Sequence, residues 1–171
     1  MGRRWDVLAG LCREEGFSCG AEIGTADGRF AAAILGALPT LKLTSVDYWP
    51  EGYLTWRGTR WPKEQQIRNR ASFVEVLFKF EGRLDLIEKP SIEAAADIPD
   101  CSLDFVFIDA GHTCEECAAD IEAWRPKVRT KGFITGHDYN RERFPGVVQA
   151  VDEAFPTIQL SEDDVWMVRK T

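Results

Sequence analysis

The feature that most constrains the fold is a predicted strand, a glycine turn and the start of a helix within residues 17–30, FSCGAEIGTADGRF. The small and apolar residues before Gly24 are typical of a strand that is covered on both faces of its sheet. Gly24 and Gly28 let the backbone turn sharply and approach a ligand, and the helix that starts near Phe30 directs its N-terminus at that ligand. The stretch therefore predicts a nucleotide-type binding turn.

Strand-like and helix-like stretches alternate along the rest of the chain, which predicts an α/β fold with a mainly parallel, doubly wound sheet. Predicted strands lie at 17–23, 43–47, 84–88, 103–109 and 131–138, and a closing hairpin pairs 157–160 with 165–169. Predicted helices lie at 3–15, 30–35, 63–80, 91–99, 114–128 with a bend near Pro126, and 145–155.

Length and charge limit the function classes. The 171 residues suffice for one domain with a sizeable core, so we expect residues 1–171 to form a single domain. The formal net charge of -7 gives no support to nucleic acid or a membrane as partner, and it suits a small neutral or cationic substrate. Without a membrane-length apolar stretch or a signal-peptide pattern, a cytoplasmic location is expected.

Residues 48–62 differ from the rest, because three tryptophans and two tyrosines lie there among prolines, glycines and arginines without periodicity. This aromatic segment is predicted to be a loop or lid that covers a bound ligand and lines a substrate pocket. An equally weighted alternative is an interface for self-association, since exposed apolar loop residues need cover.

Polar residues follow several predicted strands. Ligands of doubly wound sheets bind outside the carboxyl ends of the strands, so these residues should share one rim. Asp47 ends the second strand, where an acid can accept hydrogen bonds from both ribose hydroxyls, and this role is favoured over the alternative of a surface aspartate at a strand end. The predicted rim residues are Gly24, Asp47, Ser91, Asp109, His137 and Asp138.

The spacing Glu22-x-Gly24-x-x-x-Gly28 differs from Gly-x-Gly-x-x-Gly, whose second glycine lets the backbone meet a diphosphate. This difference weighs against an NAD or FAD site. A nucleoside without phosphates fits the turn better.

Several stretches taken together resemble class I S-adenosylmethionine-dependent methyltransferases, in particular the small branch grouped with macrolide sugar O-methyltransferases and cephalosporin-hydroxylase-like proteins. The resemblance extends over most of the chain. It rests on EIGTADG at 22–28, SVD at 45–47, FIDAGHT at 107–113, GHDY at 136–139, PGV at 145–147 and AVDE at 150–153.

The resemblance implies a Rossmann-like seven-stranded sheet of order 3-2-1-4-5-7-6 with strand seven antiparallel. It implies that Glu22, Gly24 and Gly28 line the methionine end of the donor, that Asp47 holds the ribose, and that Ser91 and Ile92 lie beside the adenine. The full predicted donor-binding set is Glu22, Gly24, Thr25, Gly28, Asp47, Tyr48, Ser91, Ile92 and Asp109.

Both histidines of the chain, His112 and His137, follow predicted neighbouring strands and lie close in sequence to Asp109 and Asp138. Histidine is well suited to proton transfer or metal ligation near neutral pH. In a purely structural alternative, His112 is a residue at the start of a helix and His137 is a hydrogen-bonded residue at the end of a strand. The predicted catalytic residues are His112, Asp109 and His137.

Two chemistries are open to this cluster. Asp109, His137 and Asp138 could hold a divalent cation such as Mg²⁺ or Mn²⁺, although metal-dependent relatives use two acidic residues at the strand-five position and His137 departs from that pattern. Alternatively, His112 takes the proton from an acceptor hydroxyl without a metal.

The sequence therefore predicts an S-adenosylmethionine-dependent methyltransferase that acts on a small molecule, at a hydroxyl oxygen. Two alternatives remain: a non-catalytic nucleoside-binding or self-associating protein with the same fold, and an NAD-dependent oxidoreductase. The sequence does not identify the acceptor.

Overall fold

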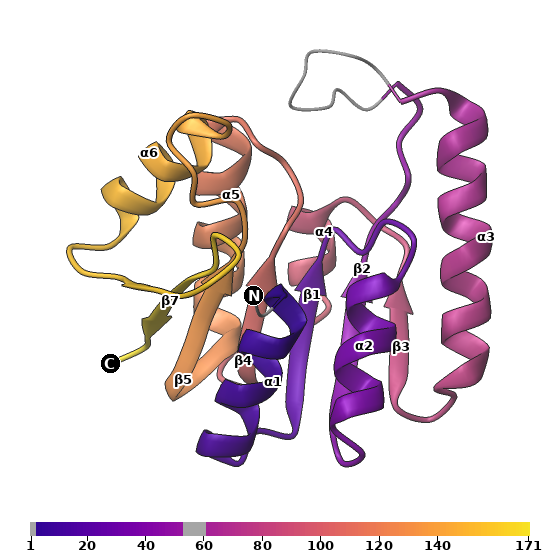
Figure 1. The fold of residues 1–171 in the computed structure, drawn as a ribbon, viewed down its shortest axis with the longest axis horizontal. Helices are drawn as coiled ribbons and strands as arrows, with labels where there is room; N and C mark the ends of the chain where they lie inside the picture. Colours follow the sequence, from indigo (N-terminus) through magenta and orange to yellow (C-terminus); the bar gives the residue numbers. More distant parts are fainter. Residues whose placement is uncertain (1–2, 53–60) are drawn as a thin grey trace.

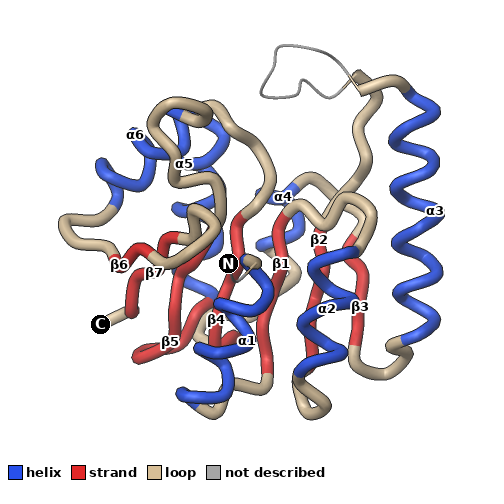
Figure 2. Tube along the Cα trace, in the orientation of Figure 1, coloured by secondary structure: helices blue, strands red, loops and turns tan. Residues whose placement is uncertain are grey.

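A seven-stranded sheet forms the centre of the molecule in the computed structural model, which describes residues 3–52 and 61–171 (Figures 1 and 2). The strand order is β3-β2-β1-β4-β5-β7-β6, and β7 is antiparallel to β5 and β6. The predicted order and the antiparallel seventh strand are confirmed. The strands are β1 (Cys19–Ile23), β2 (Lys42–Val46), β3 (Leu84–Ile87), β4 (Leu103–Ile108), β5 (Val128–Gly136), β6 (Gln159–Leu160) and β7 (Trp166–Arg169).

Helices cover both faces of the sheet, and each face has its own apolar core (Figure 1). Strand β4 contributes to both cores, because Phe105 and Phe107 point to one face while Val106 and Ile108 point to the other. The first core takes in α1 (Arg4–Glu15), α2 (Arg29–Ala37) and α3 (Lys63–Lys79), and the second takes in α4 (Ser91–Ala95), α5 (Cys114–Trp124) and α6 (Pro145–Ala154).

The register brings the carboxyl ends of the parallel strands level. Ile23, the last residue of β1, pairs with Val46 of β2 and with Ile108 of β4, and Ile108 in turn pairs with Gly136 of β5. The residues that follow these strand ends therefore share one edge of the sheet, as predicted.

Strand β5 begins at Val128, three residues earlier than the predicted strand over 131–138, and the predicted helix over 114–128 is correspondingly shorter. Helix α5 ends at Trp124 and a single 3-10 turn, η1 (Arg125–Lys127), follows it, because Pro126 has no N–H and cannot continue an α-helix. Val128 then pairs with Leu103, and the register of the two strands shifts between Leu103 and Phe105. A side chain at Gly132 would lie 2.4 Å from a backbone oxygen of β4, so glycine accommodates this irregularity.

The middle of the aromatic segment, 53–60, lies outside the described residues, so its role as a lid or interface stays a prediction. Trp49, near its start, is well packed: the side chain is buried, its Nε1–H donates to the carbonyl oxygen of Ala26 at 2.8 Å, and its ring lies against Phe73. Among the helices of residues 3–52 and 61–171, none has the length and apolar character that crossing a membrane requires.

Candidate active site

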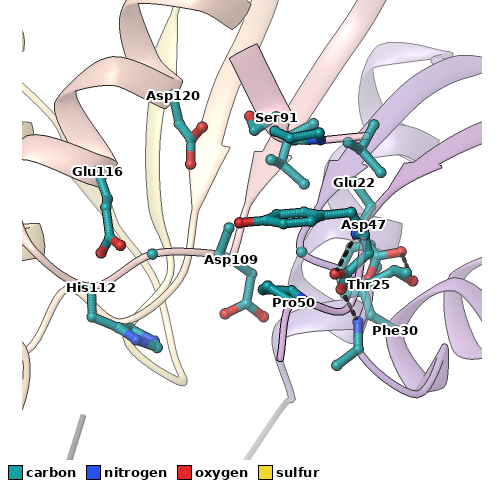
Figure 3. Close-up of a pocket in the computed structure, with 18 of the residues that line it drawn as sticks. Glu22, Thr25, Phe30, Asp47, Pro50, Ser91, Asp109, His112, Glu116 and Asp120 are labelled. Atoms are coloured by element: carbon teal, nitrogen blue, oxygen red, sulfur yellow. Dashed lines mark hydrogen bonds between the residues drawn. The ribbon is translucent and has the colours of Figure 1, made fainter. Parts of the chain in front are cut away.

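A cavity of about 710 Å³ opens at the carboxyl edge of the sheet, where β1, β2 and β4 end (Figure 3). Its volume falls in the range of sites for small molecules and cofactors. Gly28 is not among its lining residues: it caps α2 and faces Phe73. The other predicted donor-binding residues line it: Glu22, Gly24, Thr25, Asp47, Tyr48, Ser91, Ile92 and Asp109.

The floor of this pocket depends on a close approach of two strand ends. Gly24 has a φ of 87°, and a Cβ placed there would lie 2.3 Å from the carbonyl oxygen of Asp109. The backbone N–H of Asp109 donates to the carbonyl of Ile23 at 2.9 Å, and that of Gly24 donates to Val46 at 2.9 Å. Only glycine permits this crossing of the turn after β1 with the end of β4.

Glu22 lies inside the pocket wall and is almost fully buried. The hydroxyls of Thr25 and Ser45 each donate to its Oε2 at 2.8 Å. Burial raises the pKa of Glu22 to about 8, against the effect of these two hydrogen bonds. A cationic ligand beside it would favour the ionised carboxylate.

Asp47 joins the turns that follow β1 and β2. Its Oδ2 accepts the backbone N–H of Ala26 at 2.9 Å, and its Oδ1 accepts those of Tyr48 at 2.8 Å and Trp49 at 2.9 Å. Burial raises the pKa of Asp47 despite these bonds. The carboxylate is thus held rigidly at the wall of the pocket, where sequence reasoning expected a ribose ligand.

Ser91 and Asp120 lie together at another part of the wall (Figure 3). The indole N–H of Trp124 donates to Ser91 Oγ at 2.9 Å and fixes its position. Burial raises the pKa of Asp120 to about 6. This end offers a hydroxyl and a carboxyl group to a ligand that carries hydrogen-bond donors.

His112 lines the same cavity, beyond Asp109 (Figure 3). Its Nε2 lies 2.9 Å from Asp138 Oδ2, and its ring stacks on Phe144 with centroids 4.9 Å apart. Burial disfavours the charge of Asp138, but hydrogen bonds from both histidines together outweigh it and hold the pKa of this carboxyl well below its usual range. In a neutral imidazole, an ionised Asp138 favours the tautomer of His112 that has its proton on Nε2 and its lone pair on Nδ1.

The structure brings Asp109, His137 and Asp138 together, as predicted for a metal site: one donor atom from each lies within 4.8 Å of the others. These donors are already paired within the protein. His137 Nδ1 lies 2.9 Å from Asp138 Oδ1 and 3.7 Å from Asp109 Oδ1, and Arg4 Nε lies 3.2 Å from Asp109 Oδ2. The space behind the pocket that His137 and Asp138 line has a volume of only about 10 Å³.

Sequence reasoning did not assign six charged residues of the pocket wall to the site: Arg4, Asp27, Arg29, Lys89, Glu116 and Asp120. Glu116 carries one signal, the capping box Thr113-x-x-Glu116 at the start of α5. Arg4 and Asp120 lie on helices, far in sequence from the strand ends, and no motif marks them.

The comparisons with known proteins agree with this geometry. A family model described as a methyltransferase domain matches residues 21–139, well over half of the chain. The chain belongs to this methyltransferase-domain family. It is an S-adenosylmethionine-dependent methyltransferase of class I, as predicted, and not a nicotinamide-dependent oxidoreductase.

Solved structures share the fold at low sequence identity. An O-methyltransferase from Bacillus cereus in complex with SAH (S-adenosylhomocysteine) has a TM-score of 0.66 and 16% identity, over 98% of this chain and 80% of that one. An SAH-bound methyltransferase from Podospora anserina has a TM-score of 0.68 and 18% identity, over 100% and 80%. The O-methyltransferase NovP has a TM-score of 0.69 and 18% identity, over 98% and 79%. No curated protein sequence matches the chain.

Proposed function

We propose that this methyltransferase transfers the methyl group of S-adenosylmethionine to an oxygen atom of a small-molecule acceptor, with His112 as the general base. The observation that carries the proposal is the paired His112–Asp138 at the wall of the same cavity that Glu22 and Asp47 line. The O-methyltransferases among its structural neighbours support oxygen as the target.

For the donor, we propose that Glu22 faces the methionine end, that Asp47 binds the ribose, and that Ser91 and Ile92 lie beside the adenine. Asp120, next to Ser91, extends the adenine end with a carboxyl group that can accept a hydrogen bond from an exocyclic amine. The acidic wall suits a ligand that is cationic and has no phosphate.

The acceptor hydroxyl is a weak nucleophile until it loses its proton. Asp138 holds the proton of His112 on Nε2, so Nδ1 takes the hydroxyl proton as the oxygen–methyl bond forms. The bound donor supplies a methyl group on a positively charged sulfur, which leaves as a neutral thioether when the carbon–sulfur bond breaks. Phe144 stacks on the imidazole ring and so helps to orient it.

A divalent cation remains the second chemistry for this site, and Asp109, His137 and Asp138 would be its ligands. As the residues stand they do not fit it, because Arg4 pairs with Asp109 and His137 pairs with Asp138. The proposed reaction therefore uses the charged groups of the protein alone.

The acceptor is proposed to be a small molecule held between the His112 side of the cavity and the aromatic segment 48–62, whose ends contribute Pro50 and Trp61 to the lining. No nucleic acid or membrane partner is proposed. Self-association and a cytoplasmic location stay predictions.

The first test is isothermal titration of the protein with S-adenosylmethionine and SAH, since a folded protein that binds neither contradicts the donor site. The second test incubates the protein and S-adenosylmethionine with catechols, simple phenols, monosaccharides and the matching amines. It measures SAH release, and it locates the new methyl group by mass spectrometry and NMR. We expect methyl ethers. Products methylated only on nitrogen would refute oxygen as the target.

The role of His112 is tested with His112→Gln and, as a matched control on the same segment, the exposed Glu115→Gln. Loss of the base should lower turnover about 100-fold or more, while the affinity for SAH stays within about twofold. A His112→Gln enzyme that retains full turnover would eliminate His112 as the base, and the non-catalytic alternative predicts no turnover by either protein.

A further inference from the structure

Arg4 is the first residue of α1, and this helix starts at the carboxyl edge of the sheet rather than away from it (Figure 1). Two contacts fix the helix start there. The backbone N–H of Arg4 donates to Asp163 Oδ2 at 2.8 Å, and the guanidinium Nε lies 3.2 Å from Asp109 Oδ2. Asp163 belongs to the turn between β6 and β7, so Arg4 joins the two ends of the described chain to the pocket.

Arg4 lies on the side of the Asp109, His137 and Asp138 cluster that faces the large cavity. Asp109 lines both the large cavity and the small space behind it, whereas His137 and Asp138 line only the small space. Arg4 lines the large cavity and contacts Asp109 from that side. A cation that approaches Asp109 from the pocket therefore meets the guanidinium at Oδ2.

The remaining contacts close the cluster from the other sides. His137 Nδ1 lies 2.9 Å from Asp138 Oδ1, and His137 Nε2 lies 3.8 Å from Asp163 Oδ2, buried and without a hydrogen bond among the described residues. Asp138 Oδ2 is engaged by His112. The carboxylates of Asp109 and Asp138 thus face one guanidinium and two imidazoles, so each carboxylate already has partners within the protein.

We propose that Arg4 is the built-in cation of this active site: its guanidinium, paired with Asp109, supplies the positive charge that a divalent metal ion at Asp109, His137 and Asp138 would supply, and so keeps the cluster metal-free. This inference rests on the proposed function, because it assigns the cluster to the catalytic site. The guanidinium lies on the same cavity wall as His112, where negative charge develops on the acceptor oxygen. A permanently charged arginine supplies that positive charge without depending on metal supply.

The test measures Mn²⁺ binding directly, through the loss of the free-ion electron paramagnetic resonance signal, and needs no acceptor. Wild-type protein, Arg4→Met, Arg4→Lys and the neighbouring control Arg3→Met are compared at neutral pH, and SAH titration of each reports on the donor site. We expect the wild type, Arg4→Lys and Arg3→Met to bind no Mn²⁺ up to about 1 mM. We expect Arg4→Met to bind one Mn²⁺ ion with a dissociation constant at least about tenfold below that limit. Adding Asp109→Asn to Arg4→Met should abolish that binding.

Equal Mn²⁺ binding by the wild type and Arg4→Met, whether tight or absent, would overturn the proposal. The wild-type titration can still overturn the proposal if Arg4→Met fails to fold. Tight Mn²⁺ binding by the unaltered protein would show that Arg4 does not keep a metal ion out of the cluster. Failure of the proposed function is distinguishable, since it appears as absent SAH binding in every protein, including the wild type, or in the turnover tests of the preceding section, and neither readout depends on Mn²⁺.

Discussion

Single side chains of this site combine binding and structural roles, and Asp47 is the clearest case. Its two carboxylate oxygens accept three backbone N–H groups from two different turns. An alanine there removes a proposed ribose ligand and also frees the turns that shape the donor site.

We therefore expect Asp47→Ala to weaken SAH binding by about tenfold or more, because the substitution removes hydrogen bonds to a charged group. Isothermal titration measures it. The control is Asp85→Ala, on the exposed part of β3. An unchanged affinity in Asp47→Ala would remove Asp47 from the donor site.

Glu22 predicts a pH dependence of stability. Its carboxyl has a pKa of about 8 in the folded protein, above the ordinary value, so the folded state holds a proton that the unfolded chain has lost. Stability should fall as the pH rises from about 5 to about 8, by at most about 1.4 kcal/mol per pH unit. Glu22→Gln should flatten this slope and raise the unfolding free energy at pH 8, measured by urea denaturation across that range. An identical slope in both proteins would contradict a neutral Glu22.

At the scale of elements, the turns around β1 decide whether the site forms. Gly24 has a left-handed backbone and no space for a side chain, whereas a Cβ placed at Gly10, in the middle of α1, would have nothing within 4 Å.

Two alanine substitutions should therefore have opposite effects. Gly24→Ala should destabilise the protein by about 2–5 kcal/mol through strain and overlap with Asp109, and Gly10→Ala should stabilise it by about 0.5–1 kcal/mol through helix propensity. Thermal unfolding followed by circular dichroism compares them. Equal midpoints for Gly24→Ala and the wild type would mean that the two strand ends do not meet as described.

The sequence was informative about elements wherever local pattern and burial agree. Glycine spacing, apolar strands and terminal aspartates predicted β1, β2 and β4 and the rim that they form, and the family resemblance supplied the order of the outer strands. The start of β5 at Val128 was missed, because tertiary pairing with Leu103 decides it and no local pattern does.

The site was predictable only in part for the same reason. Asp109, His137 and Asp138 were expected to meet, since they follow adjacent strands. Arg4 and Asp120 were not, because helix packing brings them to the pocket from distant sequence. Asp138 also adopts a left-handed backbone with a φ of 62°, a local strain that aspartate tolerates and that no sequence pattern reveals.

At the scale of the whole molecule, the two apolar cores share one sheet. Phe105 and Val106 are neighbours in β4 and belong to different cores. A substitution that destabilises one core should therefore destabilise the other as well.

A single cooperative unfolding transition is therefore expected for the chain. Phe105→Ala should lower the unfolding free energy by about 3–5 kcal/mol, and near-ultraviolet and far-ultraviolet circular dichroism should still report the same midpoint. Val106→Ala is the matched change on the opposite face. Two separate transitions in either variant would contradict a single domain.

The bond between the start of α1 and the turn after β6 also has a consequence for biosynthesis. A ribosome makes Arg4 159 residues before Asp163, and β7 must then insert between β5 and β6. The nascent chain can build β1 to β4 and the donor turn early, but the positively charged corner of the pocket waits for residues 163–169. The proposed catalytic corner is therefore completed after the proposed donor-binding half, in the order in which the described residues are synthesised.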